Sequence, residues 1–367
     1  MRNIVSPLSG IVSPFGFRDG GALSVYAVVG LEPPLVLDFD ETFYRTGGTA
    51  TDLVSAATHA RASAATYVDA NGILQTAAIN EPRVGHHIYN GSAWVDEGYF
   101  HESDPRTNLL HTTDTLVTQS YTVTAVPHTL HFTGTGTVTL SGASTAGPLV
   151  GTGTGEQNRA SLTFTPTAGT LTVTPSGDVS DAQLEVGSTP SSYIPNLAAS
   201  GTVTRAADTL TILSANLPWN PLAVSIQMEG TMTYADTGNA TELFFLRWDE
   251  SVNERIQLYL DTITGGTGQV AFQQKKDANN DIVRSLSDTY SPGINVPFNI
   301  ASRHGSTFIN GAVDGTALTV NTTPTALPDL SFTDMQIGST FMGTIKLFRV
   351  WSDDLTDEGI AEASSNA

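Results

Sequence analysis

The sequence contains no cysteine, which excludes disulfide bonds and thiolate metal sites. Charged residues make up 14% of the 367 residues, far fewer than in an average protein, and only 16 of them are lysine or arginine. The formal net charge of −20 argues against a polyanionic partner, because neutralising phosphates requires basic side chains. No stretch is apolar enough to span a membrane, and the first residues lack the apolar run of a secretory signal. We expect no nucleic-acid partner, no membrane insertion, and folding in a cytoplasm.

Catalytic motifs are missing as well. Glycoside hydrolysis requires two carboxyl groups that flank the scissile bond, as alternating positions on one strand can provide. The nearest cluster is Asp249, Glu250 and Glu254, which falls where the chain turns between two expected strands. No G-x-S-x-G nucleophile motif occurs. The sequence therefore predicts a protein that is not an enzyme.

Abundant glycine, serine and threonine favour short strands and turns over long helices. Between residues 111 and 186, threonine-rich segments alternate apolar and polar residues with glycine or proline between them, which is typical of a jelly-roll sandwich. A second series of strands is expected at 223–234, 242–248, 255–261, 269–275, 298–303, 307–309 and 343–351. This series resembles the concanavalin-like, laminin-G-like sandwich, which Leu355-Thr356-Asp357-Glu358 would close with a short helix. We predict an all-β fold of two antiparallel β-sandwiches after an extended N-terminal peptide.

The stretch 183–208 separates the two series. It begins with an alternating strand and continues through Pro190, Pro195 and the small residues 198–201, which cannot continue a sheet. We interpret it as a linker between two sandwiches that fold separately. The predicted domains are a docking peptide at 1–33, a carbohydrate-binding-type jelly roll at 34–197 and a concanavalin-like sandwich at 198–367.

Two blocks of the sequence resemble virion proteins of tailed bacteriophages that carry carbohydrate-binding-type sandwiches. The first block contains Gln183, Leu184, Glu185 and Gly187, then Ser192 to Pro195, then Val203 to Asp208. The second contains Arg61 to Asp69, Gly72, Glu81 to Arg83, Gly98, Tyr99 and Arg106 to Leu110. The resemblance implies a fibre, spike or decoration protein of the virion, on the head or the tail, that assembles with other virion proteins in the host. We also expect a homo-oligomer, with a trimer favoured, and a host surface polysaccharide as ligand.

Residues 1–21 repeat Ile-Val-Ser-Pro at positions 4–7 and 11–14, and each proline disfavours a helix. A peptide with so many apolar side chains could dock on a neighbouring virion subunit, for example by adding to a sheet edge. A frayed tail is the alternative. The docking residues that we predict are Ile4, Val5, Ile11, Val12, Phe15 and Phe17.

Glycan binding relies on aromatic rings that stack on sugar C–H faces and on amide or guanidinium groups that bind hydroxyls. If Ile256, Leu258 and Leu260 face the core, the residues that alternate with them share the outer face of the sheet. The predicted outer row is Arg255, Gln257, Tyr259, Gln269 and Gln273, with Trp248 and Tyr290 as additional loop candidates. A solvated sheet face without a ligand would show the same pattern. The alternatives are a glycan-binding virion component, a purely structural one and, third, a glycan-degrading enzyme.

One segment resembles the start of a calcium loop. Asp277, Asn279 and Asp281 follow the D-x-N-x-D pattern, but Ile282 stands where such loops need glycine and Asp288 where they need glutamate. A hairpin tip is the simpler interpretation, and calcium is the single cofactor that we keep as an alternative. The adjacent residues 86 and 87 are both histidine and point in opposite directions on an extended segment, so we do not expect them to share a metal ion.

Overall fold

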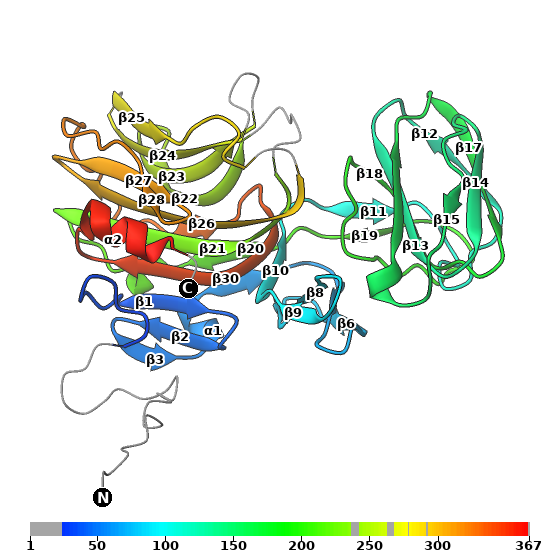
Figure 1. Cartoon of the computed structure of the whole chain (residues 1–367), viewed down its shortest axis with the longest axis horizontal. Coiled ribbons are helices and arrows are strands. Elements are labelled where there is room, and N and C mark those ends of the chain that lie inside the picture. The colour runs from blue at the N-terminus through cyan, green and yellow to red at the C-terminus, as the bar shows by residue number, and fades with distance from the viewer. Residues whose placement is uncertain (1–23, 236–241, 263–267, 278, 291–292, 366–367) are drawn as a thin grey trace, which may run out of the picture.

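The computed structural model describes residues 24–235, 242–262, 268–277, 279–290 and 293–365. Figure 1 shows two bodies, a large sandwich on the left and a smaller jelly-roll sandwich on the right. The regular structure is almost entirely antiparallel sheet, so the predicted all-β fold of two sandwiches is confirmed. No described helix is long and apolar enough to cross a membrane. The predicted docking residues lie outside the described residues.

The large sandwich consists of a ten-stranded and a seven-stranded sheet. The ten-stranded sheet has the order β28-β27-β26-β21-β30-β1-β2-β3, with β10 paired to β30 and β7 paired to β10. Its strands are β1 (Leu35–Asp38), β2 (Phe43–Thr46), β3 (Thr49–Thr51), β7 (Arg83–Val84), β10 (Tyr99–Glu102), β21 (Ala223–Ala235), β26 (Gly293–Gly305), β27 (Ile309–Val313), β28 (Thr316–Ala317) and β30 (Met342–Trp351).

The seven-stranded sheet has the order β25-β24-β23-β22-β29-β20-β4. Its strands are β4 (Thr58–Ala60), β20 (Thr209–Ile212), β22 (Leu243–Ser251), β23 (Glu254–Asp261), β24 (Gln269–Lys276), β25 (Asn279–Arg284) and β29 (Met335–Ile337). Short helical turns, α1 (Leu53–Ala56) and η2 (Ser214–Asn216), connect strands of this sandwich.

An apolar core fills the space between these two sheets. Ile256 and Leu258 of β23 and Val270 of β24 point into this core, as the alternation in the sequence predicts. Burying one such side chain contributes roughly 1.5–3 kcal/mol. Helix α2 (Thr356–Ala363) follows β30 as predicted and packs Ile360 near Trp351, in a separate small cluster beside the ten-stranded sheet.

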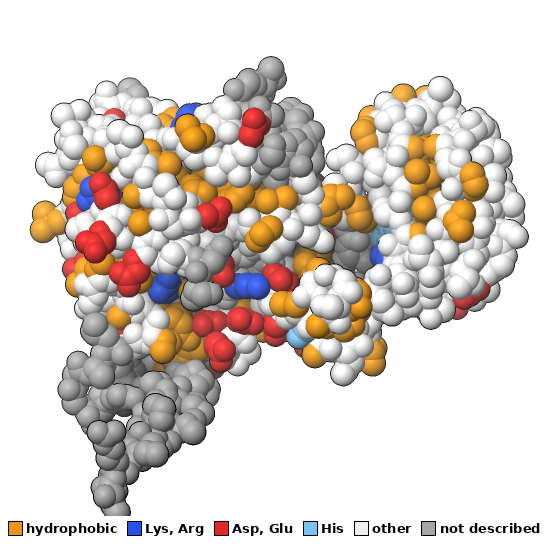
Figure 2. All heavy atoms as spheres, viewed as in Figure 1, with side chains coloured by type: hydrophobic (Ala, Val, Ile, Leu, Met, Phe, Trp, Pro, Cys, Tyr) orange, Lys and Arg blue, Asp and Glu red, His pale blue; other side chains and the backbone are white. Residues whose placement is uncertain are grey.

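The jelly-roll sandwich has its own core, which includes Leu130, Phe132, Val173 and Leu184. One sheet has the order β12-β17-β14-β15 and the other the order β16-β13-β18. The elements are β12 (Gln119–Val123), β13 (His128–Thr133), β14 (Thr137–Gly142), β15 (Leu149–Val150), η1 (Glu156–Asn158), β16 (Ala160–Phe164), β17 (Gly169–Ser176) and β18 (Ser180–Val186). Figure 2 shows mainly uncharged side chains on its visible face, whereas charged side chains gather on the large sandwich.

The jelly roll is inserted into the large sandwich, which corrects the predicted domain boundaries. Leu37 of β1 pairs with Phe348 of β30, and His59 of β4 pairs with Leu210 of β20. A chain that began at residue 198 would therefore lack β1 to β4, β7 and β10. Strands far apart in sequence pair here, and local alternation carries no information about such pairing.

Two strands carry the chain into the jelly roll and back, β11 (Arg106–Asn108) and β19 (Val203–Arg205), and they pair with each other. The chain between β4 and β10 also forms two hairpins: β5 (Ala65–Val68) with β6 (Leu74–Ala77), and β8 (His87–Tyr89) with β9 (Trp94–Asp96). The expected linker is exposed at 197–201, but Ile194 before it and Arg205 after it are buried. The stretch 183–208 is therefore built into the junction between the sandwiches.

Candidate functional site

The predicted polar row lies on the outer face of the seven-stranded sheet. Arg247 of β22, Gln257 of β23 and Gln273 of β24 stand side by side across the strands. They line a shallow pocket of about 180 Å³ that we call the sheet-face pocket, together with Glu242, Phe244, Arg255 and Tyr259. Gln269 does not line this pocket and instead donates to the carbonyl oxygen of Ser285 at 3.1 Å.

Tyr259 offers little surface for stacking because it is only 5% exposed. Its ring packs against Phe244, with centroids 5.4 Å apart, and the Arg284 guanidinium lies 5.8 Å from its centroid. Arg255 is different, since its Nε atom is buried without a hydrogen-bond partner among the described residues. The sheet-face pocket thus combines a covered tyrosine with an arginine whose Nε atom is unsatisfied.

Trp248 and Tyr290 are buried, which corrects their prediction as loop candidates. Trp248 is 0% exposed and its Nε1 atom donates to the carbonyl oxygen of Thr333 at 2.8 Å. The hydroxyl of Tyr290, also buried, donates to Asp314 at 2.9 Å. Strand β22 continues to Ser251, so Trp248 stands inside the strand with its ring in the core. Neither ring can stack on a sugar at the surface.

The calcium-like segment forms the tip of the β24–β25 hairpin, where Lys276 pairs with Asn279. Asp277 has a φ of 53°, a left-handed conformation common in tight turns. Asp281 lies farther along β25 and accepts a hydrogen bond from the backbone N–H of Thr325 at 2.7 Å. Within the described ranges, no group of three or more histidine, aspartate or glutamate residues is placed to hold a metal ion. The hairpin interpretation is confirmed, and calcium at these residues stays a prediction.

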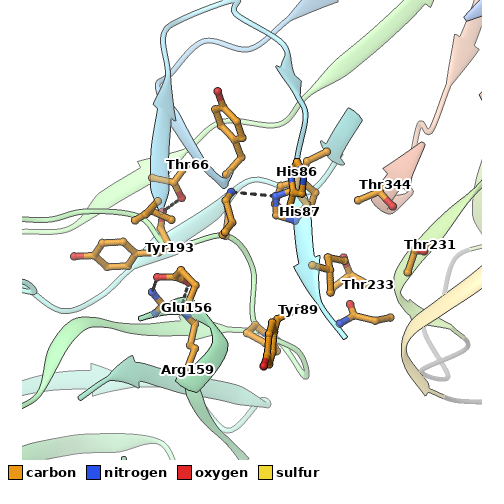
Figure 3. Close-up of a pocket in the computed structure, with 18 of the residues that line it drawn as sticks. Thr66, His86, His87, Tyr89, Glu156, Arg159, Tyr193, Thr231, Thr233 and Thr344 are labelled. Atoms are coloured by element: carbon orange, nitrogen blue, oxygen red, sulfur yellow. Dashed lines mark hydrogen bonds and ion pairs between the residues drawn. The ribbon is translucent and has the colours of Figure 1, made fainter. Parts of the chain in front are cut away.

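A larger cleft of about 310 Å³ lies where the two sandwiches and the two hairpins meet, and we call it the junction cleft. Its walls come from both hairpins, from η1 and residues 190–193 of the jelly-roll side, and from β21, β26 and β30 of the large sandwich. Figure 3 shows Tyr193 and Arg159 on one side of the cleft and Thr231 and Thr344 on the other. The histidines at positions 86 and 87 lie between these two walls.

Partly open aromatic rings line the junction cleft. Tyr89 is 38% exposed, and Tyr67 and Trp94 are half-buried. Tyr89 and Trp94 face each other across the β8–β9 hairpin, with ring centroids 5.3 Å apart. The indole of Trp94 rests against Gly72, where an added Cβ atom would come within 2.4 Å of the ring. This glycine lets the two hairpins pack closely and holds the indole at the cleft.

The inner wall of the cleft contains Phe100 and His86, whose rings are stacked with centroids 4.2 Å apart. The Arg83 guanidinium lies over the same phenyl ring at 4.3 Å. The Nδ1 atom of His86 accepts a hydrogen bond from the backbone N–H of Val68 at 3.1 Å. Burial and the nearby charge of Arg83 lower the pKa of His86 to about 3. The imidazole is therefore neutral at neutral pH.

Arg83 connects this wall to a buried ion cluster of Arg61, Arg83, Glu102, Arg205 and Asp208. It pairs with Glu102 at 2.7 Å and also with Asp208. Arg61 pairs with Asp208 at 3.0 Å, and Arg205 pairs with Glu102 at 3.1 Å. Burial alone would raise the pKa of Glu102, but the two neighbouring arginines lower it to about 2. Burial opposes the charge of Asp208 as well, but Arg83 and its other neighbours lower its pKa, so both carboxylates are charged at neutral pH.

The loop at Ser191 and Ser192 is held from both sides. Ser192 donates to Glu102 through its backbone N–H at 2.9 Å and its hydroxyl at 2.6 Å. Ser191 donates to Glu185 of β18 in the same two ways, at 2.7 Å and 2.6 Å. One serine thus binds a carboxylate of the large sandwich and its neighbour binds a carboxylate of the jelly roll. These four hydrogen bonds fix the 190–193 wall of the cleft.

Sequence reasoning missed the junction cleft, although it had singled out many residues around it. Arg61, Arg83, Arg205 and Asp208 all stand in the two blocks that resemble phage proteins. Alternation predicts strands, but it does not show how loops from separate segments meet. The arginines themselves could have indicated the ion cluster, because a buried charge is costly unless it is paired. In a chain with so few basic residues, arginines within short β-rich segments indicate such pairs.

No protein-family model and no curated protein matches the chain. Among solved structures, the CBM40 module of the Ruminococcus gnavus IT-sialidase is 13% identical with a TM-score of 0.31, covering 40% of this chain and 84% of that chain. The binding domain of botulinum neurotoxin serotype D is 13% identical with a TM-score of 0.33, covering 42% of this chain and 39% of that chain. The leech intramolecular trans-sialidase is 15% identical with a TM-score of 0.32, covering 40% of this chain and 24% of that chain. No functional argument follows from TM-scores this low.

Proposed function

We propose that the junction cleft binds a glycan. The observation that carries this proposal is the set of partly open rings, Tyr67, Tyr89 and Trp94, in one cleft that also contains amide and hydroxyl side chains. Aromatic rings stack on the apolar faces of sugars, while amides and hydroxyls bind sugar hydroxyl groups. The sheet-face pocket is the second candidate site, because four of the five predicted row residues line it and Arg255 has an unsatisfied Nε atom there.

We further propose that the chain is a structural protein of a tailed phage or phage-like particle and that the glycan belongs to the host surface. The support is the resemblance of the two sequence blocks, several residues of which build the junction. Residues 1–21 would dock the chain on other virion proteins. A shallow sugar site gives weak monovalent affinity, on the order of millimolar. A homo-oligomer such as a trimer, present in many copies, would raise the effective affinity through multivalency.

A hydrolytic role is not part of this proposal. Hydrolysis of a glycosidic bond requires two carboxyl groups that flank the bond. Among the described residues that line the junction cleft, Glu156 is the single carboxylate. It accepts two hydrogen bonds from Arg159, at 2.8 Å and 2.6 Å, so it is held as an ion pair.

The first experiment is binding of the purified full chain to a glycan array and to isolated host polysaccharide. Trp94→Ala removes the indole from the cleft and should weaken binding at least about tenfold, which corresponds to about 1.4 kcal/mol. Phe332→Ala is the matched control, because this ring is 94% exposed and does not line the cleft. Absence of any glycan binding would contradict the proposal and favour a purely structural role. Release of reducing ends from the polysaccharide would favour an enzyme.

Docking is tested separately by deleting residues 1–21. The truncated chain should remain folded and still bind glycan, but it should no longer join particles. Normal incorporation of the truncated chain would contradict the docking proposal without affecting the glycan site.

A further inference from the structure

We infer that the junction cleft selects uncharged sugars over sugars that carry a carboxylate. The inference rests on the proposed function and names the ligand class of the same site. It follows from how the ionisable side chains that line the cleft are already paired.

The cationic side chain in the lining, Arg159, is already occupied. Its Nε and Nη2 atoms donate to the Glu156 carboxylate, and its Nη1 atom donates to the carbonyl oxygen of Asp181 at 2.9 Å. The same Nη1 atom lies 3.2 Å from the Nδ1 atom of His131. A ligand carboxylate that approached this guanidinium group would also meet the Glu156 carboxylate, which already neutralises it and would repel a second negative charge.

The two histidines of the cleft are also bound to other groups of the protein. His86 accepts a hydrogen bond from a backbone N–H and stacks on Phe100, and it is buried as a neutral ring. His87 directs its nitrogen atoms at the protein, because Nδ1 lies 3.0 Å from the carbonyl oxygen of Gly85 and Nε2 lies 3.8 Å from Asp96. Neither imidazole is placed to bind a carboxylate in the cleft.

Uncharged hydrogen-bonding groups are present and available. The Oγ1 atom of Thr344 is buried in the wall without a hydrogen-bond partner among the described residues. This atom is closed to solvent in the structure, so the groups that a ligand reaches directly are the exposed ones. The amides of Gln157 and Asn295 are exposed on the same cleft, and Thr233 is half-buried there. Amides and hydroxyls donate and accept, as sugar hydroxyl groups do.

A carboxylate-bearing sugar is disfavoured for two reasons. Its charge would lose water in the cleft without gaining a cation, which costs free energy. The formal net charge of −20 also repels an anionic polysaccharide at long range, and salt screens this repulsion. A hydroxymethyl group in the same position meets neither obstacle. The sheet-face pocket is the contrast, since the unsatisfied Nε atom of Arg255 could serve an anion there.

The test uses matched pairs of ligands with the full chain. Each pair is a neutral hexose oligomer and the same oligomer in which one residue is oxidised at C6 to a uronate. Binding is measured by titration calorimetry at low and moderate salt, with the native chain, Trp94→Ala and Arg255→Ala. We expect the neutral member to bind at least about tenfold more tightly than the uronate. We also expect Trp94→Ala to weaken that binding and Arg255→Ala to leave it unchanged.

The other outcomes are distinguishable. If the uronate binds as tightly as the neutral oligomer or more tightly, and Trp94→Ala weakens that binding, the inference is overturned and the proposed function stays intact. If the chain binds the uronate but not the neutral oligomer, and Arg255→Ala abolishes this binding, the inference is overturned and the glycan site is assigned to the sheet-face pocket. No binding of either member would overturn the proposed function and the inference together.

A gain-of-charge variant provides an independent check. Gln157→Arg places a new guanidinium group at an exposed position of the cleft. If charge sets the selectivity, this variant should bind the uronate at least about tenfold more tightly than the native chain does. An unchanged preference in a folded Gln157→Arg protein would overturn the inference.

Discussion

The sheet-face pocket and the junction cleft are built in different ways. The sheet-face pocket uses neighbouring residues on three adjacent strands, so its geometry is set by one sheet and its hydrogen-bonded ladder. The junction cleft collects side chains from two hairpins, one jelly-roll loop and the large sandwich. Its shape therefore depends on the contacts that hold these segments together, above all the buried ion cluster. A substitution in the ion cluster should therefore disturb the junction cleft, whereas the sheet-face pocket depends on the seven-stranded sheet alone.

The largest expected effect comes from breaking the ion cluster. Glu102→Gln keeps the size of the side chain but leaves three guanidinium groups facing one carboxylate, and breaking a buried ion pair in this way costs about 3–5 kcal/mol. Urea unfolding should show this loss in the free energy of unfolding. Asp249→Asn, which alters a partly exposed ion pair with Arg247 beside the sheet-face pocket, should cost about 1 kcal/mol or less. Equal costs for the two variants would contradict the difference between the pockets.

Acidification should act in the same direction. The pKa of Glu102 is lowered in the fold from 4.5 to about 2, so its stabilising contribution is complete above about pH 4.5 and is lost as the pH falls toward 2. Burial lowers the pKa of His86 to about 3 and that of His59 to about 4, so unfolding takes up their protons below about pH 6.5.

The urea midpoint should therefore fall steadily from pH 7 to pH 4. In Glu102→Gln the part of this fall below about pH 4.5 should be smaller, because that carboxylate no longer titrates. A midpoint that stays constant between pH 7 and pH 4 would contradict the assigned protonation states.

Two substitutions with smaller expected effects show which of the two pockets binds the glycan. Trp94→Ala should reduce glycan binding at least about tenfold, while Arg255→Ala should change binding of a neutral glycan less than about twofold. Neither substitution alters a residue of the ion cluster or of the two sandwich cores, so circular dichroism should show that both variants remain folded. The reverse order of the two effects would assign the site to the sheet face.

The smallest expected effect concerns the exposed segment 197–201. Limited proteolysis should cut there, as the sequence predicts for a linker between Pro195 and Val203. The fragments should nevertheless remain associated in gel filtration, because β1 to β4, β7 and β10 come from the first fragment and complete the sheets of the second. Separation of the fragments under native conditions would show that these strand pairs are weak.

The sequence predicts more of the seven-stranded sheet than of the junction between the sandwiches. Alternation in β23 and β24 correctly predicted which residues face the core, because a strand exposes alternate residues on opposite faces. It placed the outer row on the opposite face, but it did not predict that Gln257, Tyr259 and Gln273 are at most 5% exposed there. It did not predict that Trp248 is in the core, since the end of β22 could not be located from the pattern. It also missed the pairing of β1 with β30, which joins residues more than three hundred positions apart.

The junction cleft could not be predicted from alternation either, because its residues come from segments that are far apart in the sequence. Arg83 and Asp208 could be recognised as members of conspicuous sequence blocks, but nothing local indicates that they form one cluster. Likewise, Trp94 reaches the cleft only because Gly72, on another hairpin, leaves space for its ring. Such contacts depend on tertiary packing, so sequence patterns named the residues but did not place them.

The most direct test of the glycan site uses the four tryptophans of the chain as reporters. Trp248 and Trp351 are buried with their indole N–H groups bonded to backbone carbonyl oxygens, whereas Trp94 lines the junction cleft. The measurement is a ¹⁵N–¹H NMR titration of the indole signals with a neutral oligosaccharide that the chain binds. A dose-dependent shift of the Trp94 signal, with the Trp248 and Trp351 signals unchanged, is the predicted result. Saturating binding that leaves the Trp94 signal in place would contradict the assignment of the glycan to the junction cleft.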